Sequence, residues 1–399
     1  MEKQKCPQVR FNSFYDEWKK QKLFDVALYK NGKSHESEIV EKGKYVVVNS
    51  KFVSTNGSVK KYCLNQIEPL HNGDIAFVLS DVPNGRALSK TFLIDKDDLY
   101  TLNQRIAAIS PRENCDSAFL HRRLDRHEYF LKFDDGVGQT NLSLRDMEEF
   151  ISFYPSRAEQ IEIGIFFQNL DQSIALHEKK LIQTQNFKKA MLEKMFPKQG
   201  SLCPEIRLKG FSGDWNIEVI GDVLQEVFRP INLDKETKYR LVTVKRRNGG
   251  IAERAILKGK DILVKSQFEV KAGDYIISKR QVVHGATGLV PPELDGSVVS
   301  NEYLVGQGTD KLNIGFFALL STLPEMYQKF FLSSYGVDIE KLFFDVNDWK
   351  KREVLLPPLE EQVQISAFFK QVDKTLNLQQ QQLQTLKNLK QALLEKMFV

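Results

Sequence analysis

Residues 27–34 are the first stretch whose residue types and spacing could do chemistry. They read ALYKNGKS and fit a relaxed form of the loop that holds nucleotide phosphates. Such a loop needs several glycines between a buried strand and a helix, with its lysine on the phosphates. Here the single glycine, Gly32, lies in a short polar turn, and the matching part of the second half, residues 227–231, lacks it. We therefore expect no nucleotide site in this stretch.

Three residues of the second half, Asp261, Glu269 and Lys271, loosely imitate the acidic and lysine set of a metal-dependent nuclease. Such combinations arise by chance in a chain rich in Lys and Glu, so solvated strand and turn residues are the simpler interpretation. The GVG of residues 136–138 is too weak a pattern for a methyl-donor site, and the histidines and serines form no recognisable nucleophile set. The sequence therefore predicts no catalytic residues and no metal site in this chain.

Basic residues gather in loops that follow predicted strands. KRRNGG occupies residues 245–250, and SKRQVVHGATG occupies residues 278–288; in the first half the corresponding loop is SDVPNGRALSK at residues 80–90. A further basic cluster, HRRLDRH, covers residues 121–127. Arg, Lys, Asn and Gln on glycine-bearing loops are the side chains that contact phosphates and base edges. Any one of them could be a solvated loop residue, but the groups favour nucleic-acid binding. The candidate binding residues are Asn84, Arg86, Lys90, Lys245, Arg246, Arg247, Asn248, Lys279, Arg280, Gln281 and His284.

The elements that must position these loops occur twice along the chain. CPQVRFNSFYDEW at residues 6–18 matches CPEIRLKGFSGDW at residues 203–215, and the run LEKMF occurs at residues 192–196 and again at 394–398. A period of about 200 residues is far longer than the units of solenoid repeats, so it indicates a domain duplication. A fixed frame around two divergent bodies suggests one chain that reads two different things.

Each body contains short runs of β-branched and aromatic residues bounded by Gly, Asn, Asp and Pro, which favour strands. These runs cover residues 44–50, 72–80 and 102–109 in the first half and residues 239–245, 272–279 and 299–305 in the second. Residues 316–332 near the end of the second body have a helical pattern. The sequence therefore predicts a mixed α/β body in each half.

A long helix is predicted at the end of each half. Pro155 and Pro357 precede the two helices, and each is followed by a Glu-Gln pair that suits a helix N-terminus. Seam positions then alternate in steps of four and three over four heptads, which is typical of a coiled coil. The apolar seam residues are Leu170, Ile174, Leu181, Met191 and Met195 in the first helix and Val372, Leu376, Leu383, Leu386, Leu393 and Met397 in the second. Polar seam positions recur as His177 with Gln379 and Lys188 with Lys390, and we expect them to fix the register.

Composition limits the class of protein. The chain has 399 residues, 42% of them hydrophobic and 27% charged, which is ordinary for a globular protein with two domains. The net charge of +5 permits an anionic partner, provided that the basic residues are concentrated locally. The four cysteines form no CxxC pair, and the sequence contains no signal peptide and no apolar run of about 18 residues. We therefore expect a cytoplasmic protein with reduced cysteines and no membrane span.

Taken together, these motifs resemble the specificity subunit of Type I restriction–modification enzymes. The second half carries CPEIRLKGFSGDW, AGDYIISKR, HGATG and VVSNEYLV, and the first carries NGDIAFVLSDVPNGRALSK and YTLNQRIAAI. GQTNL at residues 138–142, PPLEEQ at 357–362 and the two helices that end in LEKMF complete the pattern, which covers the whole chain. SRAEQ at residues 156–160 departs from the PPLEEQ form, which affects only the local helix cap.

The resemblance implies an α+β fold built by tandem duplication: two mixed α/β target recognition domains separated by two long antiparallel coiled-coil helices. The implied boundaries are residues 1–154 for the first recognition domain, 155–200 for the first spacer helix and linker, 201–356 for the second recognition domain and 357–399 for the second spacer helix. Each recognition domain would read one half of a bipartite, asymmetric double-stranded DNA site. The seam helices would also dock partner subunits.

The implied partners are two modification subunits, which methylate adenine with S-adenosylmethionine, and restriction subunits, which use ATP and Mg²⁺ to translocate and cleave DNA. No cofactor is expected in this chain itself, and the implied location is the bacterial cytoplasm. Two alternatives remain open at this point. One is a stand-alone DNA-acting enzyme that uses the acids of residues 261–271, and the other is a coiled-coil adaptor that contacts no DNA.

Overall fold

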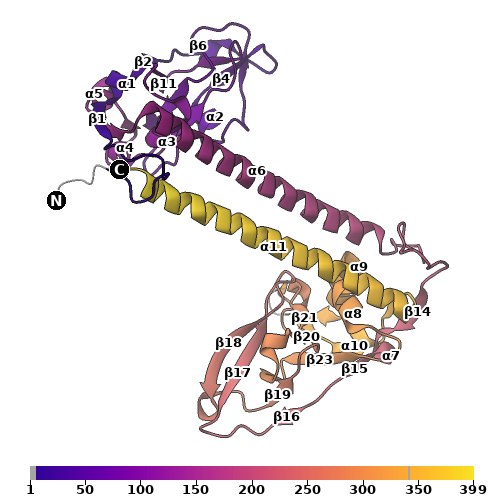
Figure 1. Cartoon of the computed structure of the whole chain (residues 1–399). Coiled ribbons are helices and arrows are strands. Elements are labelled where there is room, and N and C mark those ends of the chain that lie inside the picture. The colour runs from indigo at the N-terminus through magenta and orange to yellow at the C-terminus, as the bar shows by residue number, and fades with distance from the viewer. Residues whose placement is uncertain (1–5, 340–341) are drawn as a thin grey trace. The chain divides into compact units, whose positions relative to one another are not determined.

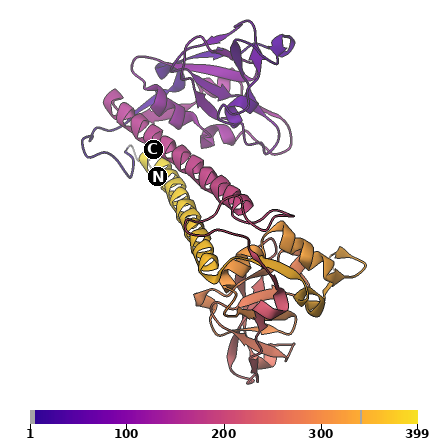
Figure 2. The same cartoon turned by 90° about the vertical axis from the view of Figure 1, so that its right-hand side faces the viewer.

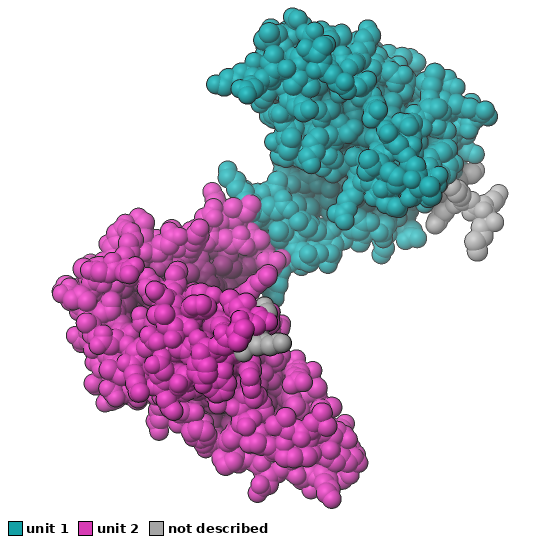
Figure 3. All heavy atoms as spheres, turned by 180° about the vertical axis from the view of Figure 1, so that it is seen from behind, with its two compact units in different colours: residues 1–179, 381–399 teal, residues 180–380 magenta. Residues whose placement is uncertain are grey.

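The computed structural model describes residues 6–339 and 342–399, and the chain forms two compact units. Unit 1 comprises Met1–Lys179 with Gln381–Val399, and unit 2 comprises Lys180–Gln380 (Figures 1 and 3). Each unit therefore contains one sheet-bearing body, part of the helix that follows it and the end of the other long helix. The domains expected from the sequence are single continuous stretches, whereas unit 1 combines two separate stretches of the chain. The expected boundaries therefore stay predictions.

Unit 1 is built around a four-stranded antiparallel sheet. Its strands, in order across the sheet, are β2 (Ala27–Asn31), β11 (Ile106–Pro111), β7 (Ile75–Val78) and β9 (Thr91–Leu93). The buried strand β7 alternates between two cores, because successive side chains of a strand point to opposite faces. Ile75 and Phe77 pack with the helices, whereas Ala76 and Val78 pack against the second sheet.

The second sheet of unit 1 has five short strands. In order they are β3 (Ile39–Val40), β5 (Tyr62–Cys63), β4 (Tyr45–Val48), β10 (Tyr100–Leu102) and β6 (Pro69–Leu70), with β10 parallel to β4. Two small pairs complete the strands: β1 (Lys19–Lys22) with β13 (Ile151–Tyr154), and β8 (Ser80–Asp81) with β12 (Thr140–Asn141). The short helices are α1 (Leu23–Val26), η1 (Glu36–Glu38), α2 (Ser50–Ser54), α3 (Ser117–Leu124), α4 (Glu128–Leu131) and α5 (Leu144–Glu148).

Unit 2 repeats this plan. Its four-stranded sheet has the order β15 (Leu224–Glu226), β23 (Tyr303–Gly308), β20 (Tyr275–Ser278) and β21 (Thr287–Leu289). Its five-stranded sheet has the order β16 (Pro230–Ile231), β19 (Gln267–Val270), β22 (Ser297–Ser300), β17 (Lys238–Val244) and β18 (Ile251–Lys258), with β17 parallel to β22. Tyr275 and Ile277 face the helices, and Ile276 faces the five-stranded sheet. The two bodies therefore share one architecture, as the duplication predicts.

Further elements frame unit 2. The strand pairs are β14 (Asn216–Val219) with β26 (Glu353–Leu356) and β24 (Ser334–Tyr335) with β25 (Phe343–Phe344). The helices are α7 (Ile220–Val223), η2 (Gly259–Asp261), η3 (Val282–His284), η4 (Pro292–Leu294), α8 (Ile314–Leu320), α9 (Pro324–Leu332) and α10 (Val346–Lys350). In unit 2 the helices α8, α9 and α10 share a core with one face of the four-stranded sheet.

Three expectations about local structure need correction. Residues 102–109 and residues 299–305 each read as one β run, but each run is divided between two sheets. Polar turns cause the division: Asn103 to Arg105 separate β10 from β11, and Arg105 adopts a φ of 68°. Asn301 and Glu302 separate β22 from β23 in the same way. The helical stretch 316–332 is likewise two helices, because Pro324 begins α9 as its first residue.

The two long helices are α6 (Arg157–Lys194) and α11 (Leu359–Met397) (Figures 1 and 2). In unit 1 the ion pairs Asp171–Lys390 and Glu178–Lys387, both 2.6 Å, join segments that run in opposite directions. In unit 2 the pair Lys188–Asp373, also 2.6 Å, does the same. Every seam position predicted from the sequence is buried or half-buried. Among the described residues, no helix is both long and apolar enough to cross a membrane.

The ends of these helices are anchored in hydrophobic cores. Phe398 stacks on Phe119 of unit 1 with ring centroids 5.5 Å apart, and Phe196 stacks on Phe316 of unit 2 at 5.6 Å. The methionines that precede them, Met397 and Met195, are buried in the same two cores. The repeated LEKMF motif therefore does more than extend the seam, because its last two residues pack into the core of one of the two bodies.

A buried polar latch fixes the start of each helix. Arg10 donates two hydrogen bonds of 2.7 Å to Glu159, and Arg207 donates bonds of 2.9 and 2.7 Å to Glu361. Both carboxylates are fully buried. The neighbouring glutamines make matching bonds: Gln160 accepts from the N–H of Asp116 and Gln362 from that of Asn313, both at 2.9 Å. The Glu-Gln pairs thus tie each helix to its body, beyond the capping role expected from the sequence.

Candidate nucleic-acid interface

The basic segment KRRNGG forms the tip of a hairpin between β17 and β18. The N–H of Lys245 donates to the carbonyl of Gly250 at 2.8 Å, and the N–H of Gly249 donates to that of Arg246 at 3.2 Å. The two residues inside this turn, Arg247 and Asn248, have φ angles of 58° and 56°. Two central residues with positive φ are the pattern of a type I′ turn, whose twist matches that of the flanking strands.

The loop between β20 and β21 supports this tip. The N–H groups of Arg247 and Asn248 donate to the carbonyls of His284 and Gly285 at 2.7 and 2.9 Å. The contact requires a glycine, because Gly285 has a φ of 70° and a Cβ there would lie 2.9 Å from Oδ1 of Asn248. The guanidinium of Arg246 donates to Oε1 of Gln281 at 2.6 Å. The structure therefore brings two separately predicted loops of the second half into one rigid surface, with Tyr327 of α9 beside it.

Lys279 and Arg280 point to a different part of this surface. The ammonium of Lys279 donates to the carbonyl of Asn301 at 2.9 Å, and the guanidinium of Arg280 donates to Glu302 at 2.8 Å. The same guanidinium lies 5.8 Å from the ring centroid of Phe343. Hydrogen bonding to Glu302 raises the pKa of Arg280. These two cations therefore attach their loop to the turn at Asn301 and Glu302 and to Phe343 of β25.

In the first half, residues 80–90 fold around a single carboxylate. Asp81 accepts hydrogen bonds from the N–H groups of Ala87 and Leu88 at 2.6 and 3.1 Å. This arrangement leaves Asn84 and Arg86 exposed at the tip of the loop. Lys90, by contrast, is half-buried, and its ammonium donates to the carbonyl of Ser54 at 3.0 Å. Lys90 thus ties the loop to the α2 segment.

Two further segments of the first half contact the 80–90 loop and were not among the predicted binding residues. One is residues 49–61, which contain α2 and contact Lys90. The other is residues 134–141, whose Gly136 carbonyl accepts a 3.3 Å hydrogen bond from Asn84. Both are rich in Asn, Gly, Ser or Asp, and NSKFVSTNGSVKK also carries three lysines. That composition was a usable signal, but it is shared by many ordinary turns.

The basic cluster HRRLDRH belongs mainly to the frame. Arg122 forms an ion pair with Asp171 of α6, and Arg123 donates hydrogen bonds to Ser152 and to the carbonyl of Val399. The guanidinium of Arg126 donates to the carbonyl of Leu88 at 3.2 Å. Burial lowers the pKa of Arg123 to about 10. These cations hold α3 against its surroundings.

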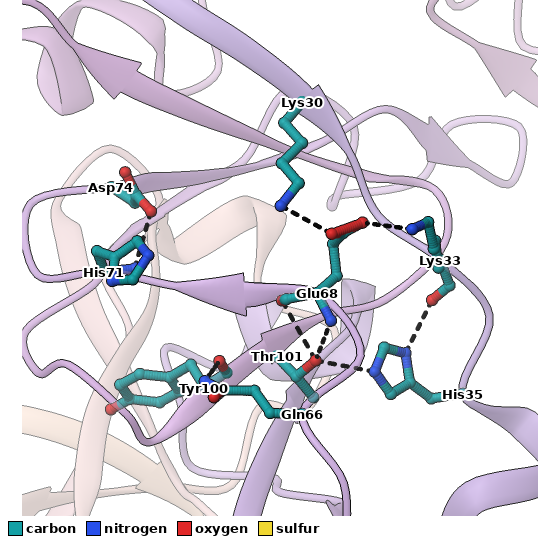
Figure 4. Close-up of polar contacts among 9 residues, drawn as sticks. All are labelled: Lys30, Lys33, His35, Gln66, Glu68, His71, Asp74, Tyr100 and Thr101. Atoms are coloured by element: carbon teal, nitrogen blue, oxygen red, sulfur yellow. Dashed lines mark hydrogen bonds and ion pairs between the residues drawn. The ribbon is translucent and has the colours of Figure 1, made fainter.

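The two lysines of the phosphate-loop pattern are also accounted for by ion pairs. Lys30 lies 2.7 Å and Lys33 lies 3.3 Å from the carboxylate of Glu68. Figure 4 shows both lysines directed at this carboxylate. The hydrogen bond from Lys30 is the main cause that lowers the pKa of Glu68. In the same network Thr101 joins the N–H of Glu68 to the ring of His35, which is fully buried. This network holds β2 and the segment after it against the five-stranded sheet.

The residues of the nuclease-like set come from different elements: Asp261 ends η2, Glu269 belongs to β19, and Lys271 follows β19. The fully buried carboxylate in this region is that of Asp274, which accepts hydrogen bonds of 2.6 and 3.1 Å from Arg229. Burial raises the pKa of Asp274, but the bond from Arg229 and further donors outweigh it, so the net pKa is lowered. Within residues 6–339 and 342–399, no three His, Cys, Asp or Glu side chains are grouped as metal ligands.

Two bodies of one architecture, each with its own polar loops and each tied to long helices, define a class of protein with two separate recognition domains. A family model described as "Type I restriction modification DNA specificity domain" matches residues 15–186 and again residues 213–388. Since these matches cover most of the sequence, the chain belongs to the Type I restriction–modification DNA specificity family. It is a DNA specificity subunit with two recognition domains, in a family whose specificity subunits are non-catalytic.

Solved structures share the fold. The S subunit of a Type I restriction–modification system from M. genitalium is 14% identical, with 99% of each chain covered and a TM-score of 0.63. A chain from a structure described as the basis of complex assembly and conformational transition of the type I R-M system is 16% identical. There 96% of this chain and 97% of that chain are covered, with a TM-score of 0.50. At these identities the likeness concerns the fold, and it includes both bodies and both long helices because nearly all of each chain is covered.

Proposed function

We propose that each recognition domain reads one half of a bipartite, asymmetric DNA site, inside a Type I restriction–modification complex of the bacterial cytoplasm. The observation that carries this proposal is the contrast between frame and loops. The latches and core anchors recur in both halves, whereas the loops at equivalent places differ in sequence and shape: residues 49–61 against 245–250, and residues 80–90 against 278–287. Two different reading surfaces on one repeated frame fit two different half-sites.

Docking of modification subunits on the long helices is supported by exposed apolar residues at matching positions. Leu176 is 64% exposed and its counterpart Leu378 is 49% exposed; Phe187 and Leu389 are 46% and 47% exposed. On each helix the two residues are about three turns apart and so share one face. Large apolar side chains that recur on a solvent-facing stripe are typical of protein interfaces. The repetition of the stripe supports two modification subunits, one for each helix.

The catalytic work is assigned to the partners. Modification subunits would supply S-adenosylmethionine-dependent adenine methylation, and restriction subunits would supply ATP- and Mg²⁺-dependent translocation and cleavage. The sequence of this chain supports that division, because its GVG at residues 136–138 is too weak a pattern for a methyl-donor site. The chain would therefore contribute sequence-specific DNA recognition and the scaffold on which the other subunits assemble.

Co-expression with the modification subunit of the same locus, in a host without adenine methylation, tests the proposal. Sequencing of modified bases should reveal one bipartite, asymmetric motif. Replacing Leu176 and Leu378 by Asp should abolish co-purification of the modification subunit while the chain alone stays folded, as shown by circular dichroism. Cleavage or methylation of DNA by the purified single chain would contradict the proposal, and so would an absence of motif with a correctly assembled complex.

A further inference from the structure

The tip of the β17–β18 hairpin contains a residue whose backbone is disfavoured for its type. Arg247 occupies the first central position of the type I′ turn with a φ of 58°, where Asn, Asp or Gly is the usual choice. Non-glycine residues with a short polar side chain, such as Asn248, tolerate this conformation, but a long unbranched side chain gains nothing from it. Strained backbone that is held in place by its surroundings points to a functional role for the residue.

Hydrogen bonds from neighbouring residues fix this strained backbone conformation. The N–H groups of both central residues are bonded to the carbonyls of His284 and Gly285, and the turn is closed by its own bond from Gly249 to Arg246. The guanidinium of Arg246 is held back by Gln281, and the side-chain oxygen of Asn248 lies over Gly285. The side chains of Arg246, Arg247 and Asn248 are all exposed. Of the two arginines in this turn, Arg247 is the one whose guanidinium forms no hydrogen bond or ion pair with any residue that the structure describes, because that of Arg246 is bonded to Gln281.

The hairpin also has the dimensions of a reading element. The paired strands have seven and eight residues, so the ribbon is roughly 23 Å long at ~3.3 Å per residue. β18 is the edge strand of its sheet. The major groove of B-DNA admits a two-stranded β-ribbon, and an arginine presented there pairs through two hydrogen bonds with O6 and N7 of guanine.

We propose that Arg247 is the guanine-reading residue of the second recognition domain, and that the 278–287 loop acts as its rigid support. Lys279 and Arg280 are then positioning residues, because their side chains are hydrogen-bonded to Asn301 and Glu302 and hold the loop in place. This inference rests on the proposed function and deepens it. It names one base contact, the side chain that makes it and the loop that orients that side chain.

The test uses the chain assembled with its modification subunit and reads methylated sites by sequencing. Arg247→Gly removes the guanidinium and suits the turn, so the melting temperature should stay equal or rise. One guanine of the second half-site should become degenerate, with discrimination against other bases reduced roughly 10- to 100-fold. Arg247→Lys keeps the positive charge but loses the paired N–H donors of the guanidinium. It should therefore reduce the preference for guanine at the same position of the motif. Lys258→Ala, which removes a cation of the same hairpin that pairs with Glu236 at 2.7 Å, should leave the motif unchanged.

Three outcomes decide between the inference and its rivals. If wild-type complex yields no bipartite motif, the proposed function fails before the inference is reached. If the wild-type motif is present and persists unchanged in both Arg247 variants, Arg247 does not read a base. If affinity falls equally for all sequences and the salt dependence weakens by about one unit, Arg247 contacts a phosphate instead, which also overturns the inference.

Discussion

The two bodies differ most at equivalent places in their five-stranded sheets. In both, one strand runs parallel to its neighbour, β4 to β10 and β17 to β22, and then continues to an antiparallel partner. In the first body the connection is a loop with the short helix α2, and the returning strand β5 has only two residues. In the second body the same connection is a long basic hairpin. One topological position therefore carries a helix-bearing loop in one half and a β-ribbon in the other.

The frame, which consists of the latches, the core anchors and the interhelical ion pairs, is by contrast almost identical in the two halves. The Arg–Glu latches, the glutamine bonds to the N–H of Asp116 and Asn313, and the stacked Phe398 and Phe196 recur with distances that differ by at most 0.2 Å. The interhelical pairs Asp171–Lys390 and Lys188–Asp373 recur at 2.6 Å. Buried charges tolerate little change, because an unpaired one is costly, whereas exposed tips tolerate much. Under the proposed function, this contrast assigns the reading of the two half-sites to the loops and not to the frame.

The largest expected effect comes from exchanging a whole body. Replacing residues 20–150 by the matching body of another family member should change the first half-site completely and leave the second as it was. The physical reason is that each body has its own cores, so its loops are positioned without help from the other. Sequencing of methylated sites provides the measurement. A chimera in which both half-sites change would show that the bodies do not read independently.

Much of the distinction between frame and loops could be predicted from the sequence. The rest could not, for physical reasons. The duplication, the long helices and their seams follow from periodicity, which sequence shows directly. The latches could not be predicted, because Arg10 and Glu159 are far apart in the chain and nothing local pairs them. The same limit applies to the candidate site. The loops at 245–250 and 278–288 were both found, but their contact through Arg247 and His284 is tertiary, and nothing in the sequence separated the support residues Lys279 and Arg280 from the exposed tip.

The next largest effect concerns the frame. Arg207→Ala leaves the buried carboxylate of Glu361 without its cation and should lower the free energy of unfolding by about 3–5 kcal/mol. Arg10→Ala should cost a similar amount through Glu159, because the two latches have the same geometry. Urea denaturation followed by circular dichroism measures both. Lys194→Ala is the matched control, since its ion pair with Glu205 is exposed and should contribute little to stability. Losses near the control value for the arginine variants would refute the latch.

The smallest predicted effect separates the two bodies by pH. His121 lies on α3 of the first body, where its Nδ1 is 2.8 Å from the hydroxyl of Thr91. Burial, aided by the nearby cations Arg122 and Lys390, lowers the pKa of His121 to about 3. The corresponding helix of the second body, α8, has the sequence IGFFALL and contains no histidine. Acid should therefore weaken the first body before the second.

The sign and size follow from proton linkage. The unfolded chain binds a proton at His121 near pH 6.5 and the folded chain does not, so stability is complete above that pH and is lost as the pH falls toward 3. Between pH 7.5 and 5.5 the loss should be about 1.4 kcal/mol. The protection factors of α3 amides, which are the intrinsic exchange rates divided by the observed rates at the same pH, should fall over this range while those of α8 change little, and His121→Asn should flatten the response of α3. An equal loss of protection in both helices, or a pH response that survives in the variant, would mean that another group causes the acid sensitivity.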